Sequence, residues 1–590
     1  MKKSLFVTRL IVSFCISLIT LGLTTFIVEA KDLELTYNNE YFLENTDSIR
    51  VINTHVIKNN SEDTILRKEN TEVFVITHLK SNLDTLKSSV DTIKVTAEGK
   101  TLPFEIEYQG DYAFVKVEYP RKVLNNDSLV ILLEYQNFGL LEKAGMLYDI
   151  YIPGVPKDTE FELENQTIKL NTTVYINDAI FPEENFVLPK PSAETLLDNG
   201  YKKYFFDSET ILGKTIWIQR GLKQFYQFKL TQKFTPTMGN DIGLRNEYAL
   251  VLPRDVDNLE IYQKVYFDQI QPLPDWIEKD ADGNLIAYFK IPSSLSGEIV
   301  VTGIVEVGIT GDVLDEASSG SLADYDITAL DYALGSAEYW EVDSLEIKKE
   351  ASELLGNKTN VYQILDNTFD FVTDSIDYSD IKRLGINQRQ GALRTLQNGS
   401  GVCMEYADLF LALARAQGIP TRAVFGYGFD PREESSSQQT HQWVTSYIPK
   451  LNKWYDLDVT WGDSGQVAEG GNLNHFYTHI VSSGPNALPD VSVNIFGTKD
   501  EVSLPQYEIT AKSEEPNIVN MTTQEDLINN YPKLQAVSVS DAILQIPLKI
   551  GAYFSNIPNK DALSIVLFTL GFCLIIVPIV LLKRKYISVN

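Results

Sequence analysis

Cysteine placement is the feature that most constrains how this chain can fold. The 590-residue sequence contains three cysteines, and Cys15 and Cys573 lie inside apolar segments near the two termini. Cys403 is the only thiol in the remainder, so no disulfide can form within the folded body. Burial of apolar side chains must therefore stabilise it. We expect three or four folded units, because single hydrophobic cores stop growing beyond about 250–300 residues.

Charge and the N-terminal residues give expectations about partners and compartment. With 80 acidic and 51 basic residues the formal net charge is −29, which argues against a nucleic-acid partner because phosphates would be repelled. Residues 1–30 combine basic residues, an apolar run and a small-residue end at Ala30, which is the pattern of a secretory signal peptide. An uncleaved anchor helix is the alternative interpretation.

A second apolar segment lies near the C-terminus. Residues 562–582 carry no charge, and at ~1.5 Å per residue a helix of this length spans roughly 30 Å, enough to cross a bilayer. The basic residues that begin the segment 583–590 are expected in the cytoplasm. The sequence thus predicts a single-pass protein of the cell membrane whose body is extracytoplasmic.

That compartment makes Cys403 unusual. Cysteines outside the cytoplasm generally form disulfides, and an unpaired thiol there is exposed to oxidation. A buried core cysteine is the ordinary interpretation of a lone thiol. The residues around Cys403 favour a functional role for this thiol instead.

Hydrophobic periodicity divides the body into units. Strand patterns predict a β-rich domain over 31–222 and a small β-sandwich over 223–310, each β-sandwich-like. Residues 311–338 are rich in Gly, Ser, Asp and Ala and are predicted to form a linker. Helical patterns followed by strand-like runs predict an α+β domain over 339–489, and the polar stretch 490–561 is predicted to be a stalk.

Within the second β unit, Ile277 to Lys290 has the pattern of a hairpin that turns at Asp282-Gly283. The run Asp280–Asn284 superficially matches a calcium loop. It lacks the full spacing and the final glutamate of an EF-hand, so the hairpin turn is favoured.

The residues after Cys403 have the pattern of an amphipathic helix. Apolar residues recur at helical spacing from Ala407 to Ala414, and Gly418 followed by Pro420 ends the helix. Cys403 therefore falls in the first turn or just before it. There the free N–H groups and the helix dipole favour an anionic sulfur, which is the nucleophilic form of a thiol.

A histidine and a carboxylate follow at a spacing that suits a triad. His441 begins an alternating strand pattern, and Asp458 lies in the next strand-like run. Neighbouring strands can place imidazole and carboxylate side by side, where the carboxylate fixes the tautomer and stabilises the imidazolium. Such a thiol, imidazole and carboxylate set performs nucleophilic acyl transfer. Asp456 is a competing carboxylate and Asp463 a weaker one.

Three segments closely resemble the transglutaminase-like (transglutaminase core) superfamily. They are Gly401–Tyr427, His441-Gln-Trp-Val and Asp458-Val-Thr-Trp, and their order and spacing also match. Val459 stands where the family usually has proline. The resemblance covers about 150 residues. It implies a papain-like fold with Cys403 as nucleophile, His441 as general base and acid, and Asp458 as the orienting group.

Other residues near these motifs have open roles. The backbone N–H of Cys403 is expected to be one oxyanion donor, and Gln388 or Gln390 is a candidate for the other. His475 and His479 are four residues apart and would share one face of a helix. No carboxylate completes a zinc set with them, so ordinary packing or a surface position is expected. Three tryptophans either wall a substrate tunnel or fill the core: Trp443, Trp454 and Trp461.

The sequence therefore predicts a membrane-anchored thiol acyl-transfer enzyme that acts on protein or peptide amide bonds, by cross-linking or by hydrolysis. Its site needs a thiol, an imidazole and a carboxylate, and no metal or cofactor. A catalytically inert cell-surface binding protein is the alternative. Rapid alkylation of Cys403 at neutral pH would separate the two.

Overall fold

A computed structural model describes residues 33–60, 66, 70–78, 83–110, 112–156, 159–163, 166–235, 245–292, 295–379, 389–429, 439–462, 473–483 and 501–533. The predicted signal peptide (1–30), membrane helix (562–582) and tail (583–590) lie outside these ranges. Within them, no helix combines the length and the apolar character needed to cross a membrane. The chain up to Pro532 forms one compact unit, and the description below concerns that unit.

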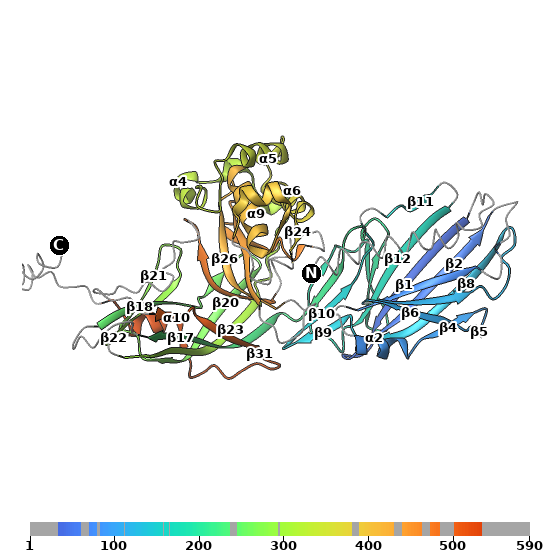
Figure 1. Ribbon diagram of the computed structural model, residues 1–590, viewed down its shortest axis with the longest axis horizontal. Helices are drawn as coiled ribbons and strands as arrows, with labels where there is room; N and C mark the ends of the chain where they lie inside the picture. Colours follow the sequence, from blue (N-terminus) through green and yellow to red (C-terminus); the bar gives the residue numbers. More distant parts are fainter. Residues whose placement is uncertain are drawn as a thin grey trace, which may run out of the picture. The chain divides into compact units, whose positions relative to one another are not determined.

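The N-terminal part is built almost entirely of strands (Figure 1). In β2 (Ile49–Asn59) nearly every second side chain is buried, as expected when one face of a sheet covers a core. A nine-stranded sheet is centred on β1 (Leu33–Leu43), which runs parallel to β12 (Gln166–Asn177) and antiparallel to β2. The other members are β4 (Lys94–Ala97), β5 (Lys100–Thr101), β8 (Asp127–Asn137), β11 (Glu162–Leu163), β14 (Ala193–Leu196) and β15 (Tyr201–Phe206).

Two smaller sheets complete this first β unit. One joins β3 (Thr71–Thr77), β7 (Tyr112–Glu118) and β6 (Glu105–Gln109). The other joins β13 (Glu184–Leu188), β16 (Ile216–Arg220), β10 (Leu147–Ile152) and β9 (Leu141–Ala144). A single apolar core connects residues of all three sheets and the short helix α2 (Leu83–Val90). The predicted strand-rich N-terminal region is thus confirmed.

The second β unit also consists of antiparallel sheets. Its centre is β17 (Lys223–Thr235), β23 (Gly297–Ile309) and β20 (Ile261–Gln271), with β19 (Val256–Asp257) at one edge. A three-stranded sheet joins β18 (Arg245–Leu252), β22 (Leu285–Pro292) and β21 (Trp276–Lys279). The hairpin predicted at Asp282-Gly283 is confirmed, because β21 pairs antiparallel with β22 and Gly283 has φ of 77°.

Residues from far later in the chain complete this second unit. β31 (Gln506–Ala511) pairs antiparallel with β17, and β30 (Glu501–Val502) and β32 (Thr522–Thr523) pair with β17 and β20. Leu527 of α10 (Gln524–Asn530) joins its core. The prediction of a stalk over 490–561 is therefore wrong for 501–530. β31 has only six residues and none is fully buried, although Tyr507 and Ile509 pack against this core, so its apolar pattern is too short to stand out in the sequence.

The predicted linker 311–338 is also folded. It contains α3 (Glu316–Ser319), η1 (Leu322–Asp324), α4 (Ile327–Leu330) and η2 (Asp331–Ala333). Its aspartates cap helices, since Asp315 and Asp326 accept from Ser318 and Ala329 backbone N–H groups. The Ser- and Asp-rich composition thus reflects capping of short helices rather than an extended linker.

The remaining residues form an α+β domain inserted between β23 and β30. Its helices are α5 (Leu345–Leu355), α6 (Val361–Ser375), α8 (Gly391–Asn398) and α9 (Cys403–Ala416). Its four-stranded sheet has the order β28 (Lys453–Leu457), β27 (Gln439–Ile448), β26 (Thr421–Gly428) and β29 (His475–Val481), all antiparallel. A short parallel pair joins β24 (Asp377–Tyr378) to β25 (Ser400–Gly401).

The sheet of this domain is covered on both faces. Ala423 and Val444 belong to the core that contains the apolar residues of α9, whereas Val424 and Trp443 belong to the core of the second β unit. The alternation follows from the two-residue period of a strand. Every side chain from Glu405 to Arg415 of α9 is buried, so this helix is fixed on all sides. Figure 1 shows α9 among the other helices and beside β26.

Candidate active site

Cys403 is the first residue of α9 and is partly exposed. The loop before it is held by Glu405, whose carboxylate accepts the backbone N–H of Val402 at 3.0 Å and that of Gln390 at 3.1 Å. The Gln390 side-chain amide donates to the Ser400 carbonyl at 2.6 Å. These bonds fix the loop that places Cys403 at a helix N-terminus, where the first backbone N–H groups have no partner within the helix.

Asp408 ties α9 to the strand that carries the histidine. Its buried carboxylate accepts from Trp340 Nε1 at 2.9 Å, from Arg389 Nε at 2.8 Å and from Gln442 Nε2 at 3.1 Å. Because Gln442 follows His441 directly, this network sets the position of the imidazole relative to the helix that carries the thiol.

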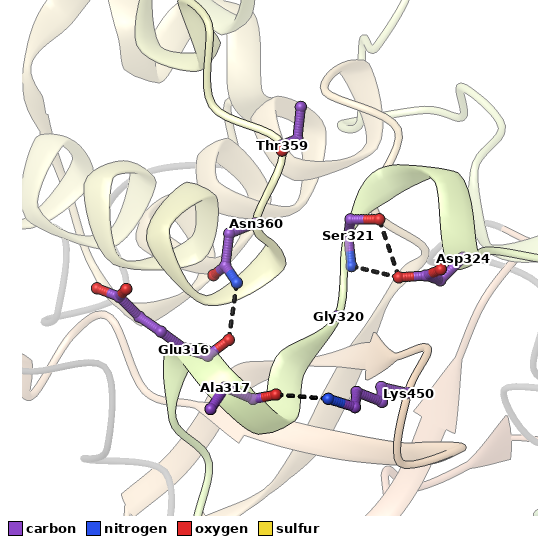
Figure 2. Close-up of a pocket in the computed structure, with 8 residues that line it drawn as sticks. All are labelled: Glu316, Ala317, Gly320, Ser321, Asp324, Thr359, Asn360 and Lys450. Carbon is purple, nitrogen blue, oxygen red and sulfur yellow. Dashed lines mark hydrogen bonds between the residues drawn. The ribbon is translucent and has the colours of Figure 1, made fainter.

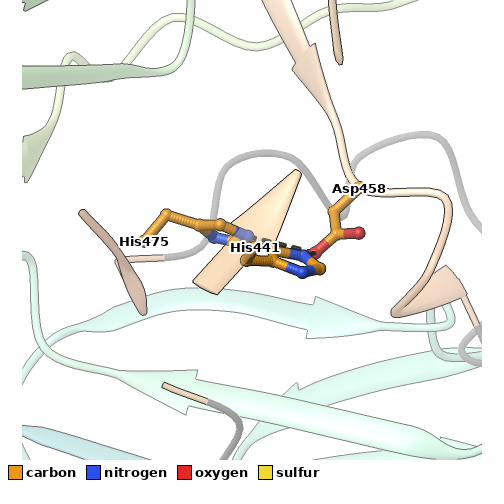
Figure 3. Close-up of side chains that lie close together, drawn as sticks. All are labelled: His441, Asp458 and His475. Carbon is orange, nitrogen blue, oxygen red and sulfur yellow. Dashed lines mark hydrogen bonds and ion pairs between the residues drawn. The ribbon is translucent and has the colours of Figure 1, made fainter. Parts of the chain in front are cut away.

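His441 and Asp458 form a buried pair. His441 Nε2 lies 2.7 Å from Asp458 Oδ2, and His475 Nε2 lies 3.0 Å from the same oxygen (Figure 3). The other oxygen, Oδ1, accepts the backbone N–H of Thr460 at 3.0 Å. An ionised carboxylate only accepts hydrogen bonds, so both imidazoles donate from Nε2. Nδ1 is therefore the nitrogen of His441 that can hydrogen-bond to the thiol of Cys403.

The charged forms of His441 and Asp458 stabilise each other. Burial disfavours the imidazolium, but the charge and hydrogen bond of Asp458, together with a hydrogen bond to Cys403, outweigh it and raise the pKa of His441 to about 10. Burial also disfavours the carboxylate, yet His441 and His475 hold the pKa of Asp458 well below its usual range. Imidazolium and carboxylate are thus both the stable forms near neutral pH.

Aromatic rings enclose the imidazole. Trp461 and Trp443 lie nearly parallel to the His441 ring, with centroids 5.2 and 5.8 Å away. Trp217 of the first β unit meets Trp461 edge-on at 6.4 Å. Trp454 lies elsewhere, under the Arg422 guanidinium at 3.6 Å. Two of the three tryptophans singled out in the sequence therefore flank the histidine.

The competing carboxylate points elsewhere. Asp456 is buried and accepts from Asn258 Nδ2 of the second β unit at 2.7 Å. Burial raises its pKa to about 7 in spite of that hydrogen bond. Asp458, not Asp456, is the aspartate in contact with His441. Asp463 and Gln388 lie outside the described residues.

Sequence reasoning missed the position of His475. His475 and His479 lie on strand β29, not on a helix as expected, and His475 contacts Asp458. His479 stacks on Phe425 at 4.8 Å instead, and burial lowers its pKa to about 4. The sequence held one usable signal. The apolar run around these residues fits a buried strand as well as a helix, and a strand can pair with β26 beside His441.

The same cluster offers the atoms of a metal site. His441, Asp458 and His475 supply two nitrogens and one oxygen within 4.8 Å of one another. Two ligands of one tetrahedral zinc, at about 2.0–2.1 Å from the metal, are roughly 3.3 Å apart. The observed nitrogen–oxygen separations of 2.7 and 3.0 Å are shorter and fit shared protons. We therefore assign hydrogen bonds here, not a metal.

A separate pocket of about 540 Å³ lies on the surface of the α+β domain and shares no residue with this cluster. Figure 2 shows its polar lining, in which Lys450 donates to the Ala317 carbonyl and Ser321 bonds to Asp324. The lining residues are Glu316, Ala317, Gly320, Ser321, Asp324, Thr359, Asn360 and Lys450.

Comparison with known proteins confirms the resemblance. Residues 348–459 match the model of the transglutaminase-like superfamily, so the chain carries a transglutaminase-like domain. This range includes Cys403, His441 and Asp458. No curated protein matches the chain.

Three solved structures show a distant likeness. A proposed cysteine protease from Cytophaga hutchinsonii is 17% identical, over 50% of this chain and 92% of its own, with a TM-score of 0.35. The periplasmic domain of TgpA from Pseudomonas aeruginosa is 16% identical, over 41% and 91%, with a TM-score of 0.23. A proposed protease from Parabacteroides distasonis is 12% identical, over 72% and 67%, with a TM-score of 0.19.

Proposed function

We propose that this protein is a thiol acyl-transfer enzyme of transglutaminase-like type that acts on amide bonds of proteins or peptides. Cys403 is the nucleophile, His441 the general base and acid, and Asp458 the orienting group. The observation that carries the proposal is the chain of contacts from the thiol at the start of α9 through His441 to buried Asp458.

In the first step the Cys403 thiolate attacks the carbonyl carbon of the substrate amide. A carbon–sulfur bond forms, the carbon–nitrogen bond breaks, and the His441 imidazolium gives its proton to the departing amine. Asp458 keeps the ring in place and stabilises its charged form. The backbone N–H groups at the start of α9 are placed to stabilise the developing oxyanion.

In the second step an amine or water attacks the thioester, and His441 accepts the proton of that nucleophile. The carbon–sulfur bond breaks and the thiolate is restored. The enclosing rings of Trp443 and Trp461 limit the access of bulk water to the imidazole. An amine acceptor gives cross-linking, and water gives hydrolysis.

We further propose that the enzyme acts outside the cytoplasm, anchored by one helix. The proposal is supported by the signal-peptide pattern of 1–30 and by the uncharged run 562–582 with basic residues after it. Protease added to intact cells is expected to digest the body and leave a small fragment ending at Asn590. A tag placed after Asn590 that can be detected from outside the cell would contradict this orientation.

Trapping of the acyl-enzyme tests the chemistry. Incubation with a lysate, rapid acid quench and mass spectrometry of the peptide that contains Cys403 are expected to show a thioester. Cys403→Ala, which removes the sulfur and little volume, is the matched control and should carry no adduct. If iodoacetamide labels Cys403 only above about pH 8.5, the pKa of an ordinary thiol, the result would favour a catalytically inert binding or scaffold protein instead.

A further inference from the structure

We infer that His475 is a positioning residue of the active site, which holds Asp458 in place for His441 by donating a hydrogen bond to the same carboxylate oxygen. This inference rests on the proposed function, because it assigns a further residue to that site. His475 does not touch Cys403 in any described contact, so its action passes through Asp458.

The geometry of the shared oxygen carries the inference. His441 and His475 both contact Asp458 Oδ2, at 2.7 and 3.0 Å, and their ring centroids are 5.5 Å apart (Figure 3). All three residues are buried: the exposed fractions are 8% for His441, 2% for His475 and 0% for Asp458. A carboxylate removed from water loses stability unless several donors contact it. His475 supplies one of these donors, and it also stops the carboxylate from rotating.

The packing around His475 leaves its ring little freedom. Trp443 and Trp461 lie against it, with centroids 4.6 and 4.8 Å away. Among the contacts given for its ring in the described part of the chain, the titratable partners are Asp458 and His441. A ring confined in this way presents Nε2–H at a fixed point, which is the property a positioning group requires.

A glycine makes this arrangement possible. His475 stands opposite Gly428 of β26, and Gly426 of the same strand stands opposite His441. A Cβ on Gly428 would lie 2.9 Å from the Trp461 ring and 3.3 Å from Cδ2 of His441. The absence of a side chain at position 428 therefore lets the two histidines and Trp461 close around Asp458.

The first β unit fixes the start of the strand that carries His475. Asn474 Nδ2 donates to Asp149 Oδ2 at 3.3 Å, and the backbone N–H of Leu473 donates to Gln219 Oε1 at 3.2 Å. Asp149 is fully buried and also accepts from Trp217 Nε1 at 2.8 Å. The residues just before His475 are thus held by a different part of the chain. This bonding explains how a residue at a strand end can act as a rigid donor.

The alkylation rate of Cys403 by iodoacetamide, measured against pH, tests the inference without any substrate. In His475→Leu the Asp458 carboxylate loses one hydrogen bond, which should weaken the thiolate–imidazolium pair of Cys403 and His441. The pH range over which iodoacetamide alkylates Cys403 rapidly should therefore narrow by about one pH unit. His475→Gln keeps an N–H donor and should retain most of the wild-type range. His475→Asn, whose amide is too short to reach Asp458, should behave like His475→Leu and serves if the leucine variant does not fold.

His479→Leu is the matched control, because His479 lies on the same strand, is held by Phe425 and Thr478, and should not alter the profile. In an Asp458→Asn background, His475→Leu should add no further change, since the residue acts through Asp458. The inference would be overturned if the pH profile of Cys403 alkylation were unchanged in both His475→Leu and His475→Asn. It would also be overturned if His475→Leu changed the profile equally in the wild type and in the Asp458→Asn background. A wild-type thiol with no rapid alkylation near neutral pH would contradict the proposed function itself and this inference with it.

Discussion

Two buried histidine–carboxylate pairs of nearly the same length lie in different regions of this protein. In the first β unit His55 Nδ1 is 2.8 Å from Glu72 Oε1, and in the α+β domain His441 Nε2 is 2.7 Å from Asp458 Oδ2. The rings of Tyr37 and Phe74 enclose His55 at 4.4 and 3.9 Å. Both aromatic residues belong to the core of that unit, so we interpret its pair as a structural one.

The second pair differs in what contacts its histidine. His441 hydrogen-bonds to a thiol at the start of a helix, and its carboxylate also accepts from a second histidine. The comparison teaches that a short, buried hydrogen bond does not by itself mark an active site. What distinguishes the proposed site is a third group beside the pair, here the partly exposed thiol of Cys403.

The largest expected effect is the loss of the nucleophile or of its base. Cys403→Ala should abolish acyl-enzyme formation, and His441→Ala should lower its rate by about 10³-fold or more, because the two act as one unit. The measurement is the rate of thioester formation, with thermal unfolding as the check on folding. Substantial thioester formation in Cys403→Ala would place the nucleophile elsewhere.

A smaller effect should separate Asp456, in β28, from Asp458, which follows the end of that strand. Asp458→Asn should slow alkylation of Cys403 at neutral pH by about 10²-fold, because the imidazolium loses its charged partner. Asp456→Asn should change the rate by less than about threefold, since Asp456 contacts Asn258 and not His441. A larger loss from Asp456→Asn than from Asp458→Asn would show that the carboxylate is wrongly assigned.

The structural pair should affect stability and leave reactivity intact. Glu72→Leu leaves His55 buried without its carboxylate and should lower the free energy of unfolding by about 3 kcal/mol. The measurements are urea unfolding and the alkylation rate of Cys403 at 25 °C in the folded protein, where the rate should stay within about twofold. A large loss of reactivity in a folded Glu72→Leu protein would remove the distinction between the two regions.

The smallest expected effect is on the pH dependence of stability. Burial raises the pKa of Asp456 to about 7, above its unfolded value, so this group costs stability as pH rises from about 4 to about 7. Glu260, with its pKa raised to about 8 mainly by burial, adds to the same trend. Asp458 is the opposite case: its lowered pKa gives stability above about pH 4 that is lost at lower pH.

Asp456→Asn should therefore reduce the difference in the free energy of unfolding between pH 5 and pH 8, measured from urea unfolding, by about 2.5 kcal/mol. Asp343→Asn, at a side chain that is 74% exposed, is the control and should leave the difference unchanged. A pH difference as large in Asp456→Asn as in the wild type would show that Asp456 does not titrate in this range.

The sequence by itself determined the local parts of this protein. The helix after Cys403, the strand of His441 and the hairpin at Asp282-Gly283 follow from side-chain periodicity and turn residues, which act over a few positions. Asp458 was expected within a strand, but β28 ends at Leu457, one residue before it. The resemblance to the transglutaminase-like superfamily then assigned roles to three of these residues. Such features can be predicted from the sequence because residues close together in the chain determine them.

Only the tertiary structure decided the rest, because those features depend on contacts between distant positions. The resemblance pointed to Asp458, but the contact of Asp458 with His441 and that of Asp456 with Asn258 depend on the direction of each side chain. The return of β31 to β17 left only a short apolar pattern in an edge strand. Gln219 meets Asn474 across 255 positions of sequence, and this bond helps to hold the strand of His475. No local pattern encodes such a pairing, because it depends on the packing and hydrogen bonding of residues that are distant in the sequence.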